Sequence, residues 1–219
     1  MACCAQRAGN AGLSESDRSR SRPPPRRAWP GMLLCASLLV LSACGDPAAE
    51  GFQLRLDSIQ EALAAGENSE ALRKARSALV EQPDSSVAGL GAAQACLGLD
   101  RFNEAADYAT TGLEHAGQDS TLVADLYWAQ GKAFLALYLQ LQAEADWRTA
   151  NSALERGADP AGTHRADAAY ALVRMQGLGG LGADSPGRRD RFAQMFLKIE
   201  PSGARADTVR ALTDGGESR

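Results

Sequence analysis

Aromatic residues are scarce in this chain, and their scarcity bears on the fold. They make up only 5% of the 219 residues, whereas alanine and leucine are abundant. Aromatic and β-branched residues are enriched in strands, while Ala and Leu are among the strongest helix formers. The composition therefore argues against a sheet-rich core. It favours helices that pack closely through small side chains, in one domain or a short repeat array.

The residues that usually carry catalysis or bind metals are also few. Only two histidines occur, and no Cys/His cluster has metal-site spacing. His115 follows a predicted helix and His164 stands in a cap-like stretch, so capping or surface roles are expected for both. No phosphate-binding loop or nucleophile elbow is present, and the glycine-rich stretch 177–182 follows a predicted helix rather than a strand. We expect no enzyme, no catalytic residue, no metal and no cofactor.

An excess of basic charge is missing from most of the chain. Residues 1–43 hold six Arg and two acidic residues, a local charge of +4. The remainder, from Cys44 onward, holds 17 basic and 25 acidic residues, a charge of −8. An acidic body has no electrostatic basis for binding nucleic acid or anionic lipid through its surface. We therefore expect no nucleic-acid partner.

The apolar stretch Met32–Ala43 is too short to span a membrane comfortably. As a helix its 12 residues would reach about 18 Å, against a hydrocarbon core of about 30 Å. Arg26 and Arg27 precede it, and the polar, proline-rich residues 1–31 cannot bury enough apolar surface to fold. A positive flank followed by a short apolar run is typical of a signal peptide.

This stretch ends in the sequence Leu41-Ser42-Ala43-Cys44, which resembles the lipobox of bacterial lipoproteins. The resemblance implies cleavage before Cys44, acylation of its sulfur and amine, and anchoring in a membrane. Several acyl chains give stable anchoring, which one chain does not. In lipoproteins, Gly45 rather than aspartate after the cysteine favours the outer membrane. An ordinary secretory signal and an Arg- and Ser-rich transit peptide are the alternatives.

The remaining cysteines leave no disulfide in the mature protein. Cys3, Cys4 and Cys35 would be removed with the signal peptide, and Cys44 would be acylated. Only Cys96 is left, so an intramolecular disulfide is excluded even in an oxidising compartment. Small apolar neighbours predict that Cys96 is a buried hydrophobic residue.

Apolar residues after residue 51 recur at steps of three and four, as in amphipathic helices. The segment EALRKARSALVEQP, from Glu70, aligns with EAADYATTGLEHAG, from Glu104. The aligned pairs Ala71/Ala105, Ala75/Ala109 and Leu79/Leu113 are each separated by 34 residues. This self-similarity resembles the tetratricopeptide repeat (TPR), a helix–turn–helix unit of that length.

Two further units follow. The third has the small and aromatic residues of the family at Tyr127, Gly131, Phe134, Ala143, Trp147 and Ala150. About four residues are expected to be inserted before it, within 115–121. A fourth, degenerate unit runs from RADAAYALVRM to RRDRFAQMFLKIEP, and the helix ARADTVRAL would cap the open end.

The sequence thus predicts an all-α fold, a right-handed solenoid of three to four TPR-like repeats preceded by a cleaved signal peptide. A generic alanine-rich bundle is the alternative. The expected regions are an N-terminal extension and signal peptide (1–43), a lipid-anchored linker (44–51), the repeat domain (52–201), and a capping helix with a disordered tail (202–219).

The TPR resemblance also implies a concave groove lined by the first helix of each repeat. By analogy, its protein-binding residues are Gln53, Gln60, Gln94, Trp128 and Lys132. Gln60, Gln94 and Lys132 share one phase, and Trp128 lies one turn before Lys132. A Trp beside long polar side chains suits the binding of an extended peptide or helix. Packing of Trp128 inside the third repeat is the alternative.

The family's basic clamp for a C-terminal carboxylate is not reproduced, because Asp125 and Ala129 occupy two of its positions. Together, the two resemblances imply a membrane-anchored, periplasm-facing adaptor. Its partners would be other envelope proteins or peptides in envelope assembly, secretion, pilus or exopolysaccharide export, and the membrane itself through Cys44. The alternative is a small-molecule carrier that works with a transporter, for which a closed apolar cavity would be expected.

Overall fold

The computed structural model describes residues 47–177 and 186–214. The chain divides into two units between Cys44 and Gly45, and all described residues belong to the second unit. The predicted signal peptide and the lipidation site Cys44 therefore lie outside the described residues. Residues 178–182 of the glycine-rich stretch 177–182 also lie outside the described residues.

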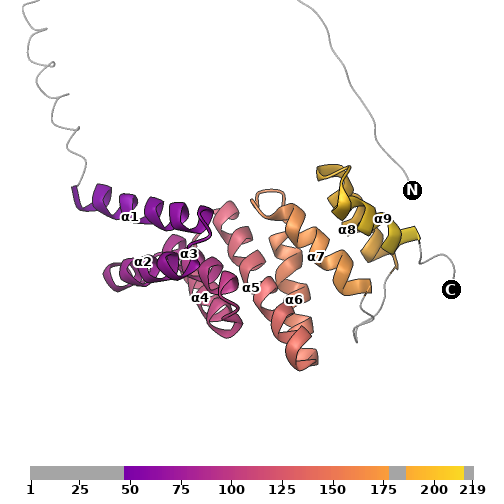
Figure 1. The fold of residues 1–219 in the computed structure, drawn as a ribbon, viewed down its shortest axis with the longest axis horizontal. Coiled ribbons are helices and arrows are strands. Elements are labelled where there is room, and N and C mark those ends of the chain that lie inside the picture. Colours follow the sequence, from indigo (N-terminus) through magenta and orange to yellow (C-terminus); the bar gives the residue numbers. More distant parts are fainter. Residues whose placement is uncertain (1–46, 178–185, 215–219) are drawn as a thin grey trace, which may run out of the picture. The chain divides into compact units, whose positions relative to one another are not determined.

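All regular secondary structure in the described residues is helical, which confirms the predicted all-α class. They contain nine α-helices and no strand (Figure 1). The helices are α1 (Pro47–Ala64), α2 (Asn68–Glu81), α3 (Ser86–Gly98), α4 (Phe102–His115), α5 (Ser120–Leu141), α6 (Glu144–Gly157), α7 (Arg165–Gly177), α8 (Pro186–Ile199) and α9 (Ala204–Asp214). Because α1 begins at Pro47, residues 47–51 of the expected linker are helical.

The helices pack in a regular order. Each helix contacts the next one in the chain, from α1 through to α9. In addition, the odd-numbered helices contact one another in succession: α1 with α3, α3 with α5, α5 with α7, and α7 with α9. No such contact joins two even-numbered helices of the described part. The odd-numbered helices therefore form a continuous layer, which we call the odd layer.

Small side chains allow close approach between neighbouring helices. Ala71, Ala75 and Ala105 are fully buried. Gly131 of α5 faces α6 so closely that a Cβ atom there would lie 2.6 Å from Cγ and 2.9 Å from the backbone nitrogen of Leu154. Helices at this separation exclude larger side chains at the contact. The alanine-rich composition is thus used where helices meet.

The length of α5 corrects one expectation. The connection between α4 and α5, residues 116–119, is as long as that between α2 and α3, residues 82–85, so no insertion lies there. The extra residues lie in α5 itself, which has 22 residues against 13 in α3. The side chain of Asp119 caps its first turn, and no proline interrupts it before Gln142, whose left-handed φ of 54° ends the helix.

Candidate functional site

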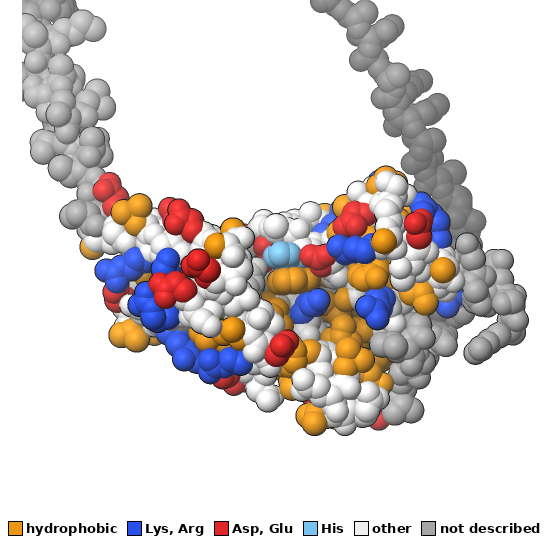
Figure 2. Space-filling model, viewed as in Figure 1, with side chains coloured by type: hydrophobic (Ala, Val, Ile, Leu, Met, Phe, Trp, Pro, Cys, Tyr) orange, Lys and Arg blue, Asp and Glu red, His pale blue; other side chains and the backbone are white. Residues whose placement is uncertain are grey.

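The described surface has a cleft between α5 and α7. It has a volume of about 410 Å³. Its lining, which defines the α5–α7 cleft, consists of Lys132, Leu135, Leu139, Asp167, Tyr170, Ala171, Arg174, Met175 and Arg205. Figure 2 shows hydrophobic side chains gathered over α5 and α7 with basic side chains beside them.

Helical periodicity places these side chains on facing surfaces. On α5, Lys132, Leu135 and Leu139 follow one another at steps of three and four residues. On α7, Asp167 and Arg174 are seven residues apart, two turns along one face. The contact between α5 and α7 is also the smallest among neighbours in the odd layer, so space remains between these helices.

Of the three cations around the cleft, one forms ion pairs with described residues and two do not. Lys132 and Arg174 are exposed, and neither forms an ion pair with any residue that the structure describes. Arg205 of α9, in contrast, is bound on several sides. It donates to Asp167 at 2.9 Å, lies 3.5 Å from Glu200, and has its guanidinium 4.7 Å from the centre of the Tyr170 ring. Two cations, one on each helix, are therefore free to meet an anion.

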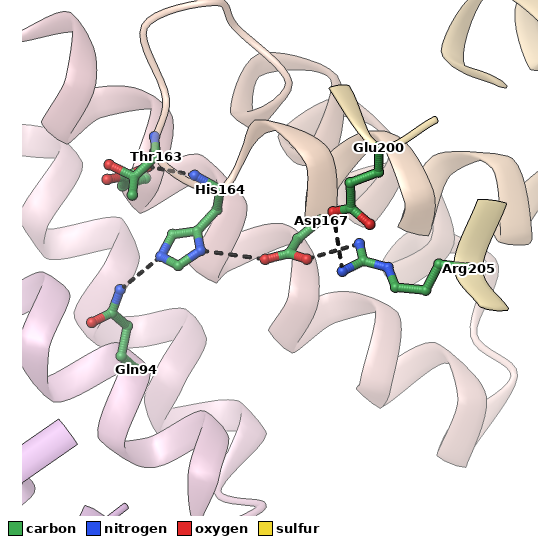
Figure 3. A network of polar contacts seen from close by, with 7 residues as sticks. Gln94, Thr163, His164, Asp167, Glu200 and Arg205 are labelled. Carbon is green, nitrogen blue, oxygen red and sulfur yellow. Dashed lines mark hydrogen bonds and ion pairs between the residues drawn. The ribbon is translucent and has the colours of Figure 1, made fainter. Parts of the chain in front are cut away.

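A polar network extends from this cleft toward α3 (Figure 3). His164 Nδ1 lies 3.4 Å from Asp167, and His164 Nε2 lies 3.3 Å from the side-chain nitrogen of Gln94. In the orientation assigned to the Gln94 amide, its nitrogen donates to Nε2, and an N–H at Nδ1 then faces Asp167. The His164 imidazole thus links Gln94 of α3 to Asp167 of α7, and Asp167 in turn accepts from Arg205 of α9.

The position of His164 is fixed by two further contacts. Its ring stacks on Trp128, with ring centres 3.7 Å apart and planes within 12°. The buried carboxylate of Asp125 accepts the backbone N–H groups of Thr163 and His164 at 2.8 and 3.3 Å. The loop before α7 is therefore attached to α5 by charge-assisted hydrogen bonds and by an aromatic stack.

The network also shifts the acidity of Asp167. The hydrogen bond from His164, followed by that from Arg205, lowers the pKa of Asp167 below its ordinary value, and these effects outweigh the opposing effect of burial. Both partners favour the ionised form. Asp167 is therefore held as a carboxylate that neutralises Arg205.

The structure separates the five groove residues predicted from the sequence. Gln94 and Trp128 meet at His164, and Lys132 lines the α5–α7 cleft. Gln53 and Gln60 lie exposed on α1 and belong neither to the cleft nor to the network. One face of the Trp128 ring is covered by His164, so the exposed Lys132 is the member of the set that lines the cleft.

The longer α5 changes the phase that we assigned to these residues. Gln94 follows Ser86, the first residue of α3, by eight residues, and Trp128 follows Ser120, the first residue of α5, by the same number. Trp128, rather than Lys132, is thus the counterpart of Gln94. This equivalence explains why both side chains contact His164.

Sequence reasoning did not assign Asp167, Arg174 or Arg205 to this region, and it expected His164 only in a capping or surface role. Asp167 and Arg174 had a detectable signal, because extending the groove phase into the fourth repeat places both on one face of the helix. His164 had none, since its contacts with α3 and α5 depend on how a loop folds back over the preceding helices.

Two kinds of feature are absent from the described residues. Within residues 47–177 and 186–214, no helix is both long and apolar enough to cross a membrane. In the same residues, no group of three His, Cys, Asp or Glu side chains is placed to hold a metal ion. No protein-family model matches the chain, and no curated protein matches it at a significant level.

Proposed function

We propose that this protein is a non-enzymatic adaptor of the bacterial cell envelope, anchored by lipid at Cys44 and facing the periplasm, that holds partner proteins against its odd layer. The single observation that carries the proposal is the α5–α7 cleft, an open hollow with an apolar floor and two cations that pair with no acidic residue in the described part of the chain. Such a surface is suited to recognition rather than to bond-making chemistry.

The odd layer supports a right-handed solenoid of TPR-like helix pairs. The pairs α1/α2, α3/α4, α5/α6 and α7/α8 are each followed by a contact between their first helices, and α9 covers α7 and α8. When the first helices touch and the second helices do not, the stack curves around the first helices. The odd layer then forms the concave surface, where solenoid proteins bind their partners.

Lipid anchoring rests on the lipobox-like sequence Leu41-Ser42-Ala43-Cys44. We expect Cys44→Ala to yield an unprocessed precursor that no longer incorporates labelled palmitate in growing cells. Incorporation equal to that of the wild type would contradict the anchor. This test is independent of the binding surface, so the two parts of the proposal fail separately.

Crosslinking in intact cells tests the adaptor function. A photo-crosslinking amino acid at Leu139, on the edge of the cleft, should capture envelope proteins that mass spectrometry then identifies. The matched control is Val80 of α2, which is 83% exposed and lies outside the odd layer. Equal adducts at both positions, or none at Leu139, would contradict binding through this surface.

A small-molecule carrier is the second candidate, favoured by one observation. The volume of the cleft, about 410 Å³, falls within the usual range of ligand sites, about 300–1,000 Å³. Its rim, however, includes exposed Lys132, Leu139 and Arg174, so the hollow is open rather than enclosed. An open rim is better suited to a polypeptide, which extends beyond the hollow on both sides.

A further inference from the structure

We infer that the α5–α7 cleft recognises an internal peptide segment in which one bulky apolar side chain is flanked by carboxylates. The inference rests on the proposed adaptor function and specifies the chemistry of the partner. It is argued from the floor of the cleft, from the charges on its two walls, and from the arrangement of those charges.

The floor of the cleft is apolar. Leu135, Tyr170 and Met175 line it, together with Ala171. A volume of about 410 Å³ accommodates one large side chain with its neighbours, and it is too small for a folded domain. Interfaces are commonly anchored by a bulky side chain that fills such a hollow. We therefore assign the floor to an apolar anchor of the partner.

The walls of the cleft carry a surplus of positive charge. The described lining holds three cations and one carboxylate, Asp167, and that carboxylate already neutralises Arg205. Lys132 and Arg174 remain without a charged partner among the described residues. This surplus stands out in a body whose charge is −8. A complementary ligand therefore carries negative charge.

The placement of the two cations specifies where those charges lie. Lys132 stands on α5 and Arg174 on α7, one on each wall of the cleft. Carboxylates on both sides of the apolar anchor give each cation a partner, and the Arg174 guanidinium suits bidentate binding of a carboxylate. A single carboxylate at the end of a chain would leave one cation unmatched, which is why the segment is internal.

Fluorescence anisotropy with a defined peptide tests this inference. The probe is a rhodamine-labelled peptide, acetylated and amidated at its ends, with one central phenylalanine flanked by two glutamates on each side. We expect it to bind the purified full-length chain. The same peptide with glutamine in place of every glutamate should bind at least tenfold more weakly, because it lacks the matching charges.

Variants of the protein locate the site. Lys132→Gln and Arg174→Gln should each weaken binding about threefold, the scale of an exposed ion pair, and the double variant about tenfold. Lys198→Gln is the matched control, since it removes an exposed lysine of α8 outside the cleft. Leu139→Glu, which adds a repelling carboxylate at the rim, should also weaken binding. Far-UV circular dichroism and the unfolding midpoint verify that each variant is folded.

The inference is overturned if the two peptides bind equally, or if the Lys132/Arg174 double variant binds as the wild type does. It is also overturned if dodecanoate or phosphatidylglycerol vesicles bind through the two cations while the peptide does not. Crosslinking from Leu139 separates this failure from that of the adaptor function. Adducts that persist without peptide binding overturn only the ligand chemistry, whereas loss of adducts overturns the adaptor itself.

Discussion

The core of α1–α4 consists largely of alanines, whereas the core of α5–α9 also contains bulky aromatic side chains. Between α1 and α4, the contacts are dominated by buried alanines such as Ala75 and Ala92. Between α6 and α9, the core contains Trp147, Phe192 and Phe196 together with branched aliphatic residues. Small side chains allow helices to approach closely, whereas large ones set a wider spacing between them.

The two regions also treat their surface charges differently. In α1–α4, the arginines pair with nearby acids: Arg55 with Glu81, Arg73 with Glu70, and Arg76 and Arg101 with Glu104. In α5–α9, Arg148 and Arg188 are likewise paired with Glu144 and Glu155, but Lys132 and Arg174 face the cleft without a described acidic partner. The second region thus differs in holding two cations beside a cleft without an acidic partner among the described residues.

Truncating one core side chain in each region should produce the largest contrast. Phe196 is fully buried against Tyr170 and Arg205, so Phe196→Ala should lower the free energy of unfolding by about 3–5 kcal/mol. Ala75→Gly in α2 should cost about 1 kcal/mol, the difference in helix propensity. Urea unfolding measures both. Equal losses would mean that the two cores do not differ as described.

Removing the buried carboxylate of Asp125 should have the next largest effect. Asp125→Ala leaves the backbone N–H groups of Thr163 and His164 without an acceptor, which should cost about 2–3 kcal/mol. Asp125→Asn retains one oxygen acceptor and serves as the matched control, with a smaller loss. Hydrogen exchange at residues 163 and 164 should accelerate in Asp125→Ala, and unchanged exchange there would contradict the proposed attachment of this loop.

Adding a methyl group at a glycine in each region should give opposite results. In Gly157→Ala the new Cβ would lie 2.8 Å from the backbone nitrogen of Trp128, so we expect a loss of about 1–3 kcal/mol. In Gly89→Ala of α3 the nearest atom lies 3.4 Å away, an ordinary contact, and helix propensity favours alanine by up to about 1 kcal/mol. Thermal unfolding of both variants measures the difference, and destabilisation by Gly89→Ala would contradict it.

The smallest expected effect depends on pH. The pKa of Asp167 is lowered in the folded protein, so its stabilising contribution is present above its ordinary value of 3.8 and is lost as the pH falls below it. Because Asp167 is 41% exposed, we expect Asp167→Asn to cost only about 0.5–1 kcal/mol at pH 7. At pH 3 this difference should shrink, and a difference that is independent of pH would exclude the assigned ion pair.

The sequence was sufficient to predict the all-α class, because helix propensity and periodicity are local properties. It named Lys132 by analogy with the repeat family, and the structure places this exposed residue in the lining of the α5–α7 cleft, but the phase it assigned to Lys132 was that of Trp128. It did not reveal the length of α5. Without a proline or a pair of glycines to mark the end of a helix, the sequence does not show whether the helix continues or turns. His164 was missed because its contacts with Gln94 and Trp128 are set by tertiary packing.

The central claim is that partners bind at the unpaired charges of the α5–α7 cleft rather than at the paired charges of α1–α4. Crosslinking from Leu139 in intact cells, carried out in two double variants, tests it most directly. We predict that Lys132→Gln with Arg174→Gln removes most of the adduct, while Arg73→Gln with Arg76→Gln, which removes as much charge from α2, leaves it unchanged. Equal adducts in the two variants would contradict the claim.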